Sequence, residues 1–164
     1  MALIAITGTP GVGKSHLTEF LIKHLGADHI DLHRQYKNLK TVYNYKKQCY
    51  DLDYTKVMLF VKKKKAGSKV THQILDSHIS HCLPSDLVDI VIVLTTNDLN
   101  ELTTRLRNRK YSEKKIRENL ECEMFQVCFE QAQQNHRVVF RYDTSKKNFE
   151  KDVLKDLQKT LSVK

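Results

Sequence analysis

The chain of 164 residues has no tryptophan, only two prolines, and no apolar run as long as a membrane-spanning helix, so we expect no membrane association. Its four cysteines form no C-x-x-C pair and have no disulfide-like spacing, which is typical of reduced thiols in a cytosolic or nuclear protein. The chain also lacks internal repeats, low-complexity tracts and a dividing linker. We therefore predict one domain with a single sizeable core. The first expected strand begins at Leu3, so we expect no signal or transit peptide.

Glycine is scarce as well, yet three of the five glycines fall in one stretch near the N-terminus. There the apolar run Leu3–Thr7 leads into Gly8–Ser15 (GTPGVGKS), which fits the phosphate-binding pattern G-x-x-x-x-G-K-S/T at every fixed position. Glycines at 8, 11 and 13 let backbone N–H groups close around phosphate oxygens. Lys14 would bring a positive charge to the β- and γ-phosphates, and the Ser15 hydroxyl would bind Mg²⁺. A helix carrying Leu17, Phe20, Leu21 and Leu25 is predicted to follow. The stretch predicts a nucleoside triphosphate site.

Positive charge is in excess, and it is unevenly distributed. The formal net charge is +9, and residues 33–65 alone contain ten lysines and arginines against two aspartates, or +8. Such a segment is expected to face polyanions, which include nucleotides and RNA. The alternative is an ordinary solvated basic face.

Strands and helices are expected to alternate along the rest of the chain. Further strands are predicted at 29–31, 70–75, 90–94 and 138–141, and further helices from 32, at 54–65, 98–107, 112–134 and 149–161. Residues 43–54 are interpreted as a loop or mobile flap. In the helix 112–134, Ile116, Leu120, Met124 and Val127 form the expected apolar stripe. This order predicts an α/β fold of three layers, α/β/α, around a central parallel five-stranded sheet.

Several charged residues outside the phosphate-binding loop are candidates for the chemistry. Asp76 ends an apolar strand, from which a carboxylate reaches Mg²⁺ directly or through water. Arg105 and Arg109 are four residues apart, so on a helix they would share a face and clamp one anion, whereas Arg107 would point elsewhere. Arg34, at the start of the basic segment, is a candidate for the phosphate of an acceptor nucleotide.

Two other interpretations are less favoured by the sequence. No N-K-x-D guanine motif follows a strand, and residues 95–98 (TTND) resemble it only superficially, which disfavours a GTPase. His72, His78, His81 and Cys82 form one loose cluster without the paired spacing of a structural zinc site, so Mg²⁺ is the only metal predicted.

The motifs together resemble the adenylate kinase isoenzyme 6 family, which is also known as coilin-interacting nuclear ATPase protein. The resemblance rests on GTPGVGKS, on the strand-end D-x-H at Asp76–His78, on R-L-x-x-R-x-Y at 105–111, and above all on YSEKKIRENLECEMFQVCFEQA at 111–132. It covers nearly the whole chain and is weak between 35 and 68. It implies a P-loop nucleoside monophosphate kinase fold in one domain, with a core at 1–32, 69–104 and 113–164, an NMP-binding insert at about 33–68 and a short lid at about 105–116.

The resemblance also implies an activity and site residues. Family members transfer phosphate from ATP to AMP, hydrolyse ATP, and bind a small-subunit ribosomal protein during rRNA maturation, in nucleus and cytoplasm and as monomers. Carried over by motif, Gly11, Gly13, Lys14, Ser15 and His16 would contact ATP phosphates, as would Arg109. Asp31 and Arg34 would bind AMP, and Asp76 and His78 would take part in catalysis. Lys146 would lie near the adenine. This chain departs from the family pattern at Lys46, Lys47, Lys110 and His16.

Three hypotheses follow. The first is an ATP:AMP phosphotransferase that uses Lys14, Arg34, Asp76, Arg105 and Arg109. The second is a ribosome-assembly ATPase with little kinase turnover, which docks on a pre-ribosomal particle or rRNA through the basic segment 33–65. The third, a binding module that uses ATP only for stability, is disfavoured by the intact Lys14, Ser15 and Asp76.

Overall fold

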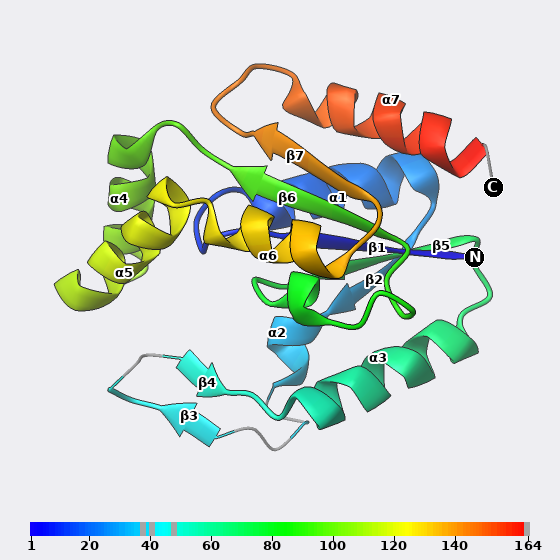
Figure 1. Cartoon of the computed structure of the whole chain (residues 1–164), viewed down its shortest axis with the longest axis horizontal. Helices are drawn as coiled ribbons and strands as arrows, with labels where there is room; N and C mark the ends of the chain where they lie inside the picture. The colour runs from blue at the N-terminus through cyan, green and yellow to red at the C-terminus, as the bar shows by residue number, and fades with distance from the viewer. Residues whose placement is uncertain (37–38, 40–41, 47–48, 163–164) are drawn as a thin grey trace.

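A computed structural model describes residues 1–36, 39, 42–46 and 49–162, with only the backbone of 49 and 50. Its centre is a five-stranded parallel sheet in the order β2-β5-β1-β6-β7 (Figure 1). The strands are β1 (Ala2–Thr7), β2 (Asp28–Asp31), β5 (His72–Asp76), β6 (Ile90–Thr95) and β7 (Val139–Asp143). The predicted fold class is therefore confirmed, and β2 forms one edge of the sheet.

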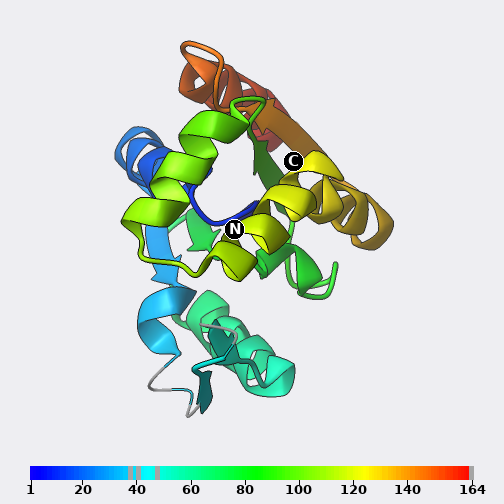
Figure 2. The same cartoon turned by 90° about the vertical axis from the view of Figure 1, so that its left-hand side faces the viewer.

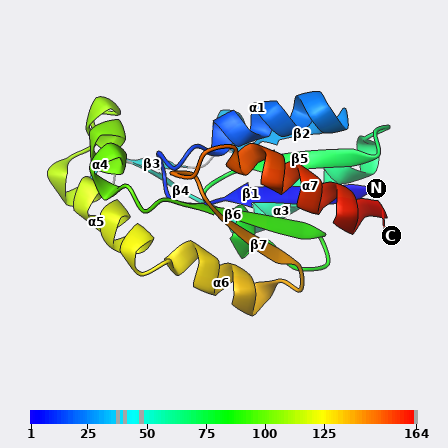
Figure 3. The same cartoon turned by 90° about the horizontal axis from the view of Figure 1, so that it is seen from above.

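Helices cover both faces of this sheet, as Figure 3 shows from above. The helices are α1 (Lys14–Leu25), α2 (Leu32–Gln35), α3 (Tyr54–Gly67), α4 (Leu99–Asn108), α5 (Glu113–Met124), α6 (Val127–Asn135) and α7 (Phe149–Ser162), with a 3₁₀ turn η1 at Ser80–Cys82. Alternate residues of β1 serve the two faces. Ile4 and Ile6 pack in one core cluster with residues of α1 and α7, and Leu3 and Ala5 pack in a second with residues of α3 and α6. Among the described residues, no helix is long and apolar enough to cross a membrane.

The segment interpreted as a loop contains regular structure, so that interpretation was wrong. Strands β3 (Val42–Asn44) and β4 (Cys49–Asp51) form an antiparallel hairpin, with Val42 opposite Asp51. The Asn44 side-chain amide donates to Asp51 Oδ2 at 3.2 Å across the pair. Lys46 lies at the hairpin turn and is exposed, whereas Lys47 falls outside the described residues. Each strand has only three residues, which is too short for an alternation of apolar and polar side chains to be recognised in the sequence.

The predicted helix 112–134 is also two helices in the structure. Ser112 caps α5 as expected, by accepting from Lys115 N. The chain then turns at Gln126, which has a left-handed φ of 51°, and α6 begins at Val127. Because α5 ends at Met124, this side chain is 62% exposed instead of lying on the apolar stripe. Glu123 is buried, with 6% of its surface exposed.

One lysine of the basic run ties α3 to the core of the protein. Lys65 Nζ lies 2.7 Å from Leu87 O and 3.0 Å from Asp89 Oδ2, and the same carboxylate oxygen accepts from Leu3 N at 2.9 Å. Lys65 is therefore structural, although the sequence predicted that the basic segment 33–65 faces polyanions or solvent. The C-terminal end of α3 is held by charge as well as by packing.

We expect Lys65→Met to lower the free energy of unfolding by about 1–3 kcal/mol, because Asp89 would keep a partly buried charge without its ammonium partner. Urea denaturation monitored by circular dichroism measures this. Lys62→Met, an exposed position on the same helix, is the matched control. Equal stability of the two variants would show that the bonds of Lys65 to Leu87 and Asp89 contribute nothing to the free energy of unfolding.

Candidate functional site

The phosphate-binding loop, residues 8–15, connects β1 to α1 and lies at the carboxyl end of the sheet (Figures 1 and 2). Gly8 has φ 137°, and a Cβ atom there would lie 2.3 Å from Leu94 O. Gly11 also has a left-handed φ, of 93°, and a Cβ there would lie 3.0 Å from Leu102 Cδ1. These two glycines therefore allow the loop to pack closely on β6 and α4. The predicted strand, loop and helix are all present in order.

Lys14 lies in the first turn of α1 and folds back over the loop. Its Nζ donates to Gly8 O at 2.7 Å and to Thr9 O at 3.0 Å. Burial lowers the pKa of Lys14 to about 8, and the nearby Asp76 carboxylate partly opposes that shift. The protein thus keeps a partly desolvated cation where phosphate oxygens would lie.

Ser15 and Asp76 are brought together by the sheet. Asp76 ends β5 and is in register with Ile6 of β1, so it lies beside the start of the loop. Ser15 Oγ donates to Asp76 Oδ2 at 3.3 Å. Burial raises the pKa of Asp76, and Lys14 opposes that shift. A hydroxyl and a carboxylate side by side are the oxygen ligands that Mg²⁺ prefers, so these residues fit the predicted metal.

His78 and His81 follow β5 but have different surroundings. His78 is exposed on one side, yet desolvation by neighbouring atoms, followed by the charges of Lys14, His33 and Lys115, lowers its pKa to about 4. It is therefore neutral at pH 7. His81 is buried, with Nδ1 2.6 Å from Thr7 Oγ1 and Nε2 2.9 Å from Gln131 Oε1. These bonds give His81 a structural role in joining β1 to α6.

The predicted arginines lie along α4 and at its end. Arg105 Nη1 donates to Gly11 O at 3.0 Å, and its other nitrogen pairs with Glu101. Arg109 is the C-cap residue of α4 and lies close enough to Lys14 for its charge to lower that pKa. Arg107 pairs with Glu113, away from the loop, as expected. The structure therefore places both arginines of the proposed clamp beside the phosphate-binding loop.

Two further predicted ligands flank the loop on the side of α7. His16 is exposed, and its Nε2 lies 2.9 Å from Glu150 Oε1. Lys146 is exposed in the segment between β7 and α7, where Thr144 Cγ2 would lie 4.0 Å from a Cβ on Gly13. The segment that carries Lys146 thus borders the phosphate-binding loop.

The predicted acceptor residues lie at the same end of the sheet. Asp31 ends β2 and is in register with Asp76 of β5. Its Oδ1 caps α2 by accepting from Arg34 N at 3.1 Å, and its Oδ2 pairs with Arg34 Nε at 3.1 Å. The Arg34 side chain is 83% exposed, so its guanidinium faces solvent.

Sequence reasoning missed Glu123, a buried carboxylate behind the phosphate-binding loop. Glu123 Oε1 accepts from Thr96 N at 2.7 Å, and the carboxylate is also hydrogen-bonded to the Thr9 side chain. Burial raises its pKa, while the bonds from Thr9 and Thr96 oppose the shift. The signal was present, because Glu123 lies three residues after Leu120 and seven after Ile116, on the apolar face of the predicted helix.

Comparison with known proteins agrees with this geometry. Residues 4–126 match a protein family described as "AAA domain". An "Adenylate kinase isoenzyme 6 homolog" of Dictyostelium discoideum is 36% identical over 141 residues, which cover 82% of this chain and 75% of that protein. A protein of the same description from Schizosaccharomyces pombe is 35% identical over 136 residues, which cover 80% of this chain and 74% of that protein. The chain belongs to the adenylate kinase isoenzyme 6 family. That family is one of kinases, and membership in it supports a kinase-type function for the chain.

Solved structures confirm the fold of this family member. A shikimate kinase from Acinetobacter baumannii has a TM-score of 0.67 at 13% identity and covers all of this chain. A deoxyadenosine kinase from M. mycoides has a TM-score of 0.57 at 17% identity and covers 96%. At such low identity these likenesses show the P-loop kinase fold alone.

The desolvated lysine predicts a stability difference that depends on pH. At pH 7 we expect Lys14→Met to unfold with a free energy about 1–3 kcal/mol higher than the native chain, because the ammonium is destabilised by burial. Above pH 8 the folded chain has released this proton while the unfolded chain keeps it up to about pH 10.4, so the native chain gains stability as pH rises. Urea titrations between pH 7 and 10 test this. A difference that does not change with pH would contradict the lowered pKa.

Glu123→Ala should lower the free energy of unfolding by about 2–3 kcal/mol and weaken nucleotide binding, because Thr96 N–H and the Thr9 hydroxyl lose a charged partner. Glu123→Gln, which can still accept hydrogen bonds, should lie between the native chain and Glu123→Ala. Thermal unfolding and calorimetric titration with Mg·ATP measure the two effects. Glu121→Ala is the exposed control on α5. An equal loss of stability and of Mg·ATP binding in that variant would contradict the role given to Glu123.

Proposed function

We propose that the protein is a Mg²⁺-dependent phosphotransferase that converts ATP and AMP to two ADP. The observation that carries the proposal is the pairing of β2 with β5, which sets Asp31 beside Asp76 at the carboxyl end of the sheet. Arg34, which pairs with Asp31, therefore lies at the same end of the sheet as Lys14, Ser15 and Asp76. A protein that only hydrolysed ATP would need no arginine on the acceptor side.

In this proposal the chain supplies position and charge, which is what phosphoryl transfer needs. Lys14 exchanges its bonds to the loop carbonyls for phosphate oxygens, while Ser15 and Asp76 hold Mg²⁺, which neutralises phosphate charge. Arg105 and Arg109 approach the donor phosphates from α4, and Lys146 lies on the side proposed for adenine. Arg34 orients the AMP phosphate for in-line attack. Neutral His78 adds no charge and can hydrogen-bond at the site.

The test is an assay of purified protein with Mg·ATP, with and without AMP, that resolves ADP from inorganic phosphate. We expect two ADP per AMP consumed and little free phosphate. Lys14→Ala should lower the rate at least about a hundredfold. Arg34→Ala should raise the KM for AMP about tenfold and leave that for ATP unchanged, since it removes a charge-assisted bond of roughly 1.5–3 kcal/mol. Arg107→Ala, which pairs away from the loop, is the matched control.

Phosphate released at the same rate without AMP would contradict the transferase and favour a second function. That second proposal is a ribosome-assembly ATPase that docks on a small-subunit ribosomal protein or rRNA. It is supported by the exposed lysines at 46, 56 and 62–64, within the predicted NMP-binding insert. The lysines at 37, 40 and 47 lie outside the described residues.

A further inference from the structure

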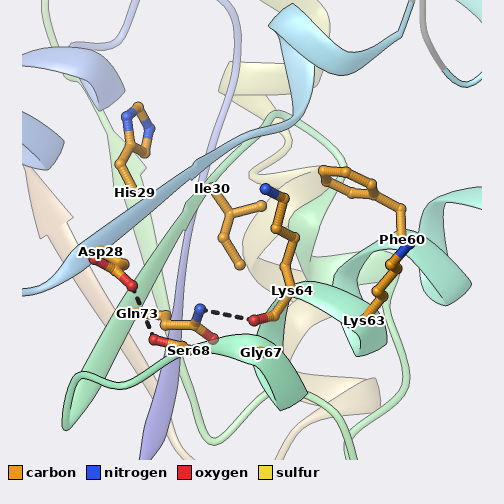
Figure 4. Close-up of a pocket in the computed structure, with 9 residues that line it drawn as sticks. All are labelled: Asp28, His29, Ile30, Phe60, Lys63, Lys64, Gly67, Ser68 and Gln73. Carbon is orange, nitrogen blue, oxygen red and sulfur yellow. Dashed lines mark hydrogen bonds between the residues drawn. The ribbon is translucent and has the colours of Figure 1, made fainter.

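A second cavity lies away from the phosphate-binding loop, between the edge strand β2 and the C-terminal half of α3 (Figure 4). Its volume is about 590 Å³, within the range of small-molecule sites. It is bounded by Asp28, His29 and Ile30 of β2 and by Phe60, Lys63 and Lys64 of α3. The cavity is large enough for a ligand of metabolite size.

The position of this cavity separates it from the kinase site. Asp28 begins β2 and is in register with Gln73 near the start of β5, whereas Asp31 and Asp76 end the same two strands. Three residues of strand correspond to about 10 Å. The cavity therefore opens at the amino end of the sheet, and the phosphate-binding loop lies at the carboxyl end.

The walls combine apolar and cationic groups. The Phe60 ring and the Ile30 side chain face the same space in Figure 4, and Lys64 Nζ lies 5.8 Å from the centre of that ring. Lys63 is exposed at the mouth and makes no ion pair with any residue that the structure describes. The only carboxylate among the lining residues, that of Asp28, already accepts from Ser68 Oγ at 2.8 Å. An anion with an aromatic ring matches this arrangement.

The floor of the cavity has an unmet hydrogen-bonding group. Gln73 is 2% exposed, and its Nε2 donates to Lys64 O at 3.2 Å. Its Oε1 is buried and accepts no hydrogen bond from any part of the chain that is described. A buried acceptor without a partner is uncommon in native proteins, and rotation of the Gln73 amide toward the cavity would let a ligand N–H satisfy it.

We propose that this cavity binds a nucleoside monophosphate at a site separate from the kinase site. The base packs against Phe60 and Ile30, and an amino group of the base donates to Gln73. The phosphate lies between the ammonium groups of Lys63 and Lys64, where Lys64 exchanges its contact with the Phe60 ring for a full ion pair. Stacking of a base on an aromatic ring strengthens binding by only about 5- to 150-fold, so ring and phosphate are both needed for appreciable affinity.

The test is a titration of the full chain, labelled with ¹⁵N, with AMP, while the backbone amides of Gly67 and Ser68 are followed by NMR. We expect saturable shifts at these amides with AMP and much weaker ones with adenosine or inorganic phosphate alone. The double variant Lys63→Ala/Lys64→Ala should weaken binding at these amides at least about a hundredfold, since each charged bond strengthens binding about tenfold or more. Phe60→Leu should weaken it several-fold, and Lys62→Ala is the matched control.

The absence of shifts at Gly67 and Ser68, or equal binding by the double variant, would overturn the proposal. Equal binding of inorganic phosphate and AMP would also overturn it, because the cavity would then be a simple anion site. The result does not depend on the kinase assay. AMP that shifts Arg34 but not Gly67 would support the acceptor site alone, and shifts at Gly67 without phosphate transfer would support this cavity alone.

Discussion

A lysine ammonium partly withdrawn from water is the constraint on which the carboxyl end of the sheet depends. Lys14 lies against the carbonyls of its own loop, so its charge needs compensation from nearby carboxylates. Asp76 on β5 and Glu123 on α5 supply that compensation from two directions, and both have raised pKa values because they share the same poorly solvated space. Function and stability are therefore opposed at this point, as they commonly are where charge is stored for a reaction.

Features that depend on a few neighbouring residues could be predicted from the sequence. The loop at 8–15, its strand and its helix follow from glycine geometry and local apolar spacing, and Asp76 follows from the end of a strand. The burial of Glu123 could be predicted from its place on the apolar face of the helix, but its partners Thr9 and Thr96 could not, because they are distant in sequence and meet it only after the sheet has formed. The break at Gln126 was missed for a related reason, since a glutamine with a left-handed φ has no sequence signature.

The number of basic residues in the segment 33–65 does not by itself define a positively charged surface. Of its described residues, Lys65 turns toward the core, while Arg34 and Lys56 pair with Asp31 and Asp53. The other exposed lysines among its described residues are 62–64, which follow one another around α3, and Lys46 at the hairpin turn. In the described part of the segment, Lys63 and Lys64 thus border the amino end of the sheet, whereas Lys46 lies apart from them on the hairpin.

The bonds of Lys65 to Leu87 and Asp89 also determine how α3 can move relative to the sheet. A helix of 14 residues is about 21 Å long, so a rotation about its C-terminal end displaces its N-terminal end most. A rotation of about ten degrees about Lys65 would carry Tyr54, eleven residues away, by about 3 Å. Lys63 and Lys64, which lie next to the pivot, would hardly move. The acceptor side could close over a substrate while the cavity beside β2 kept its shape.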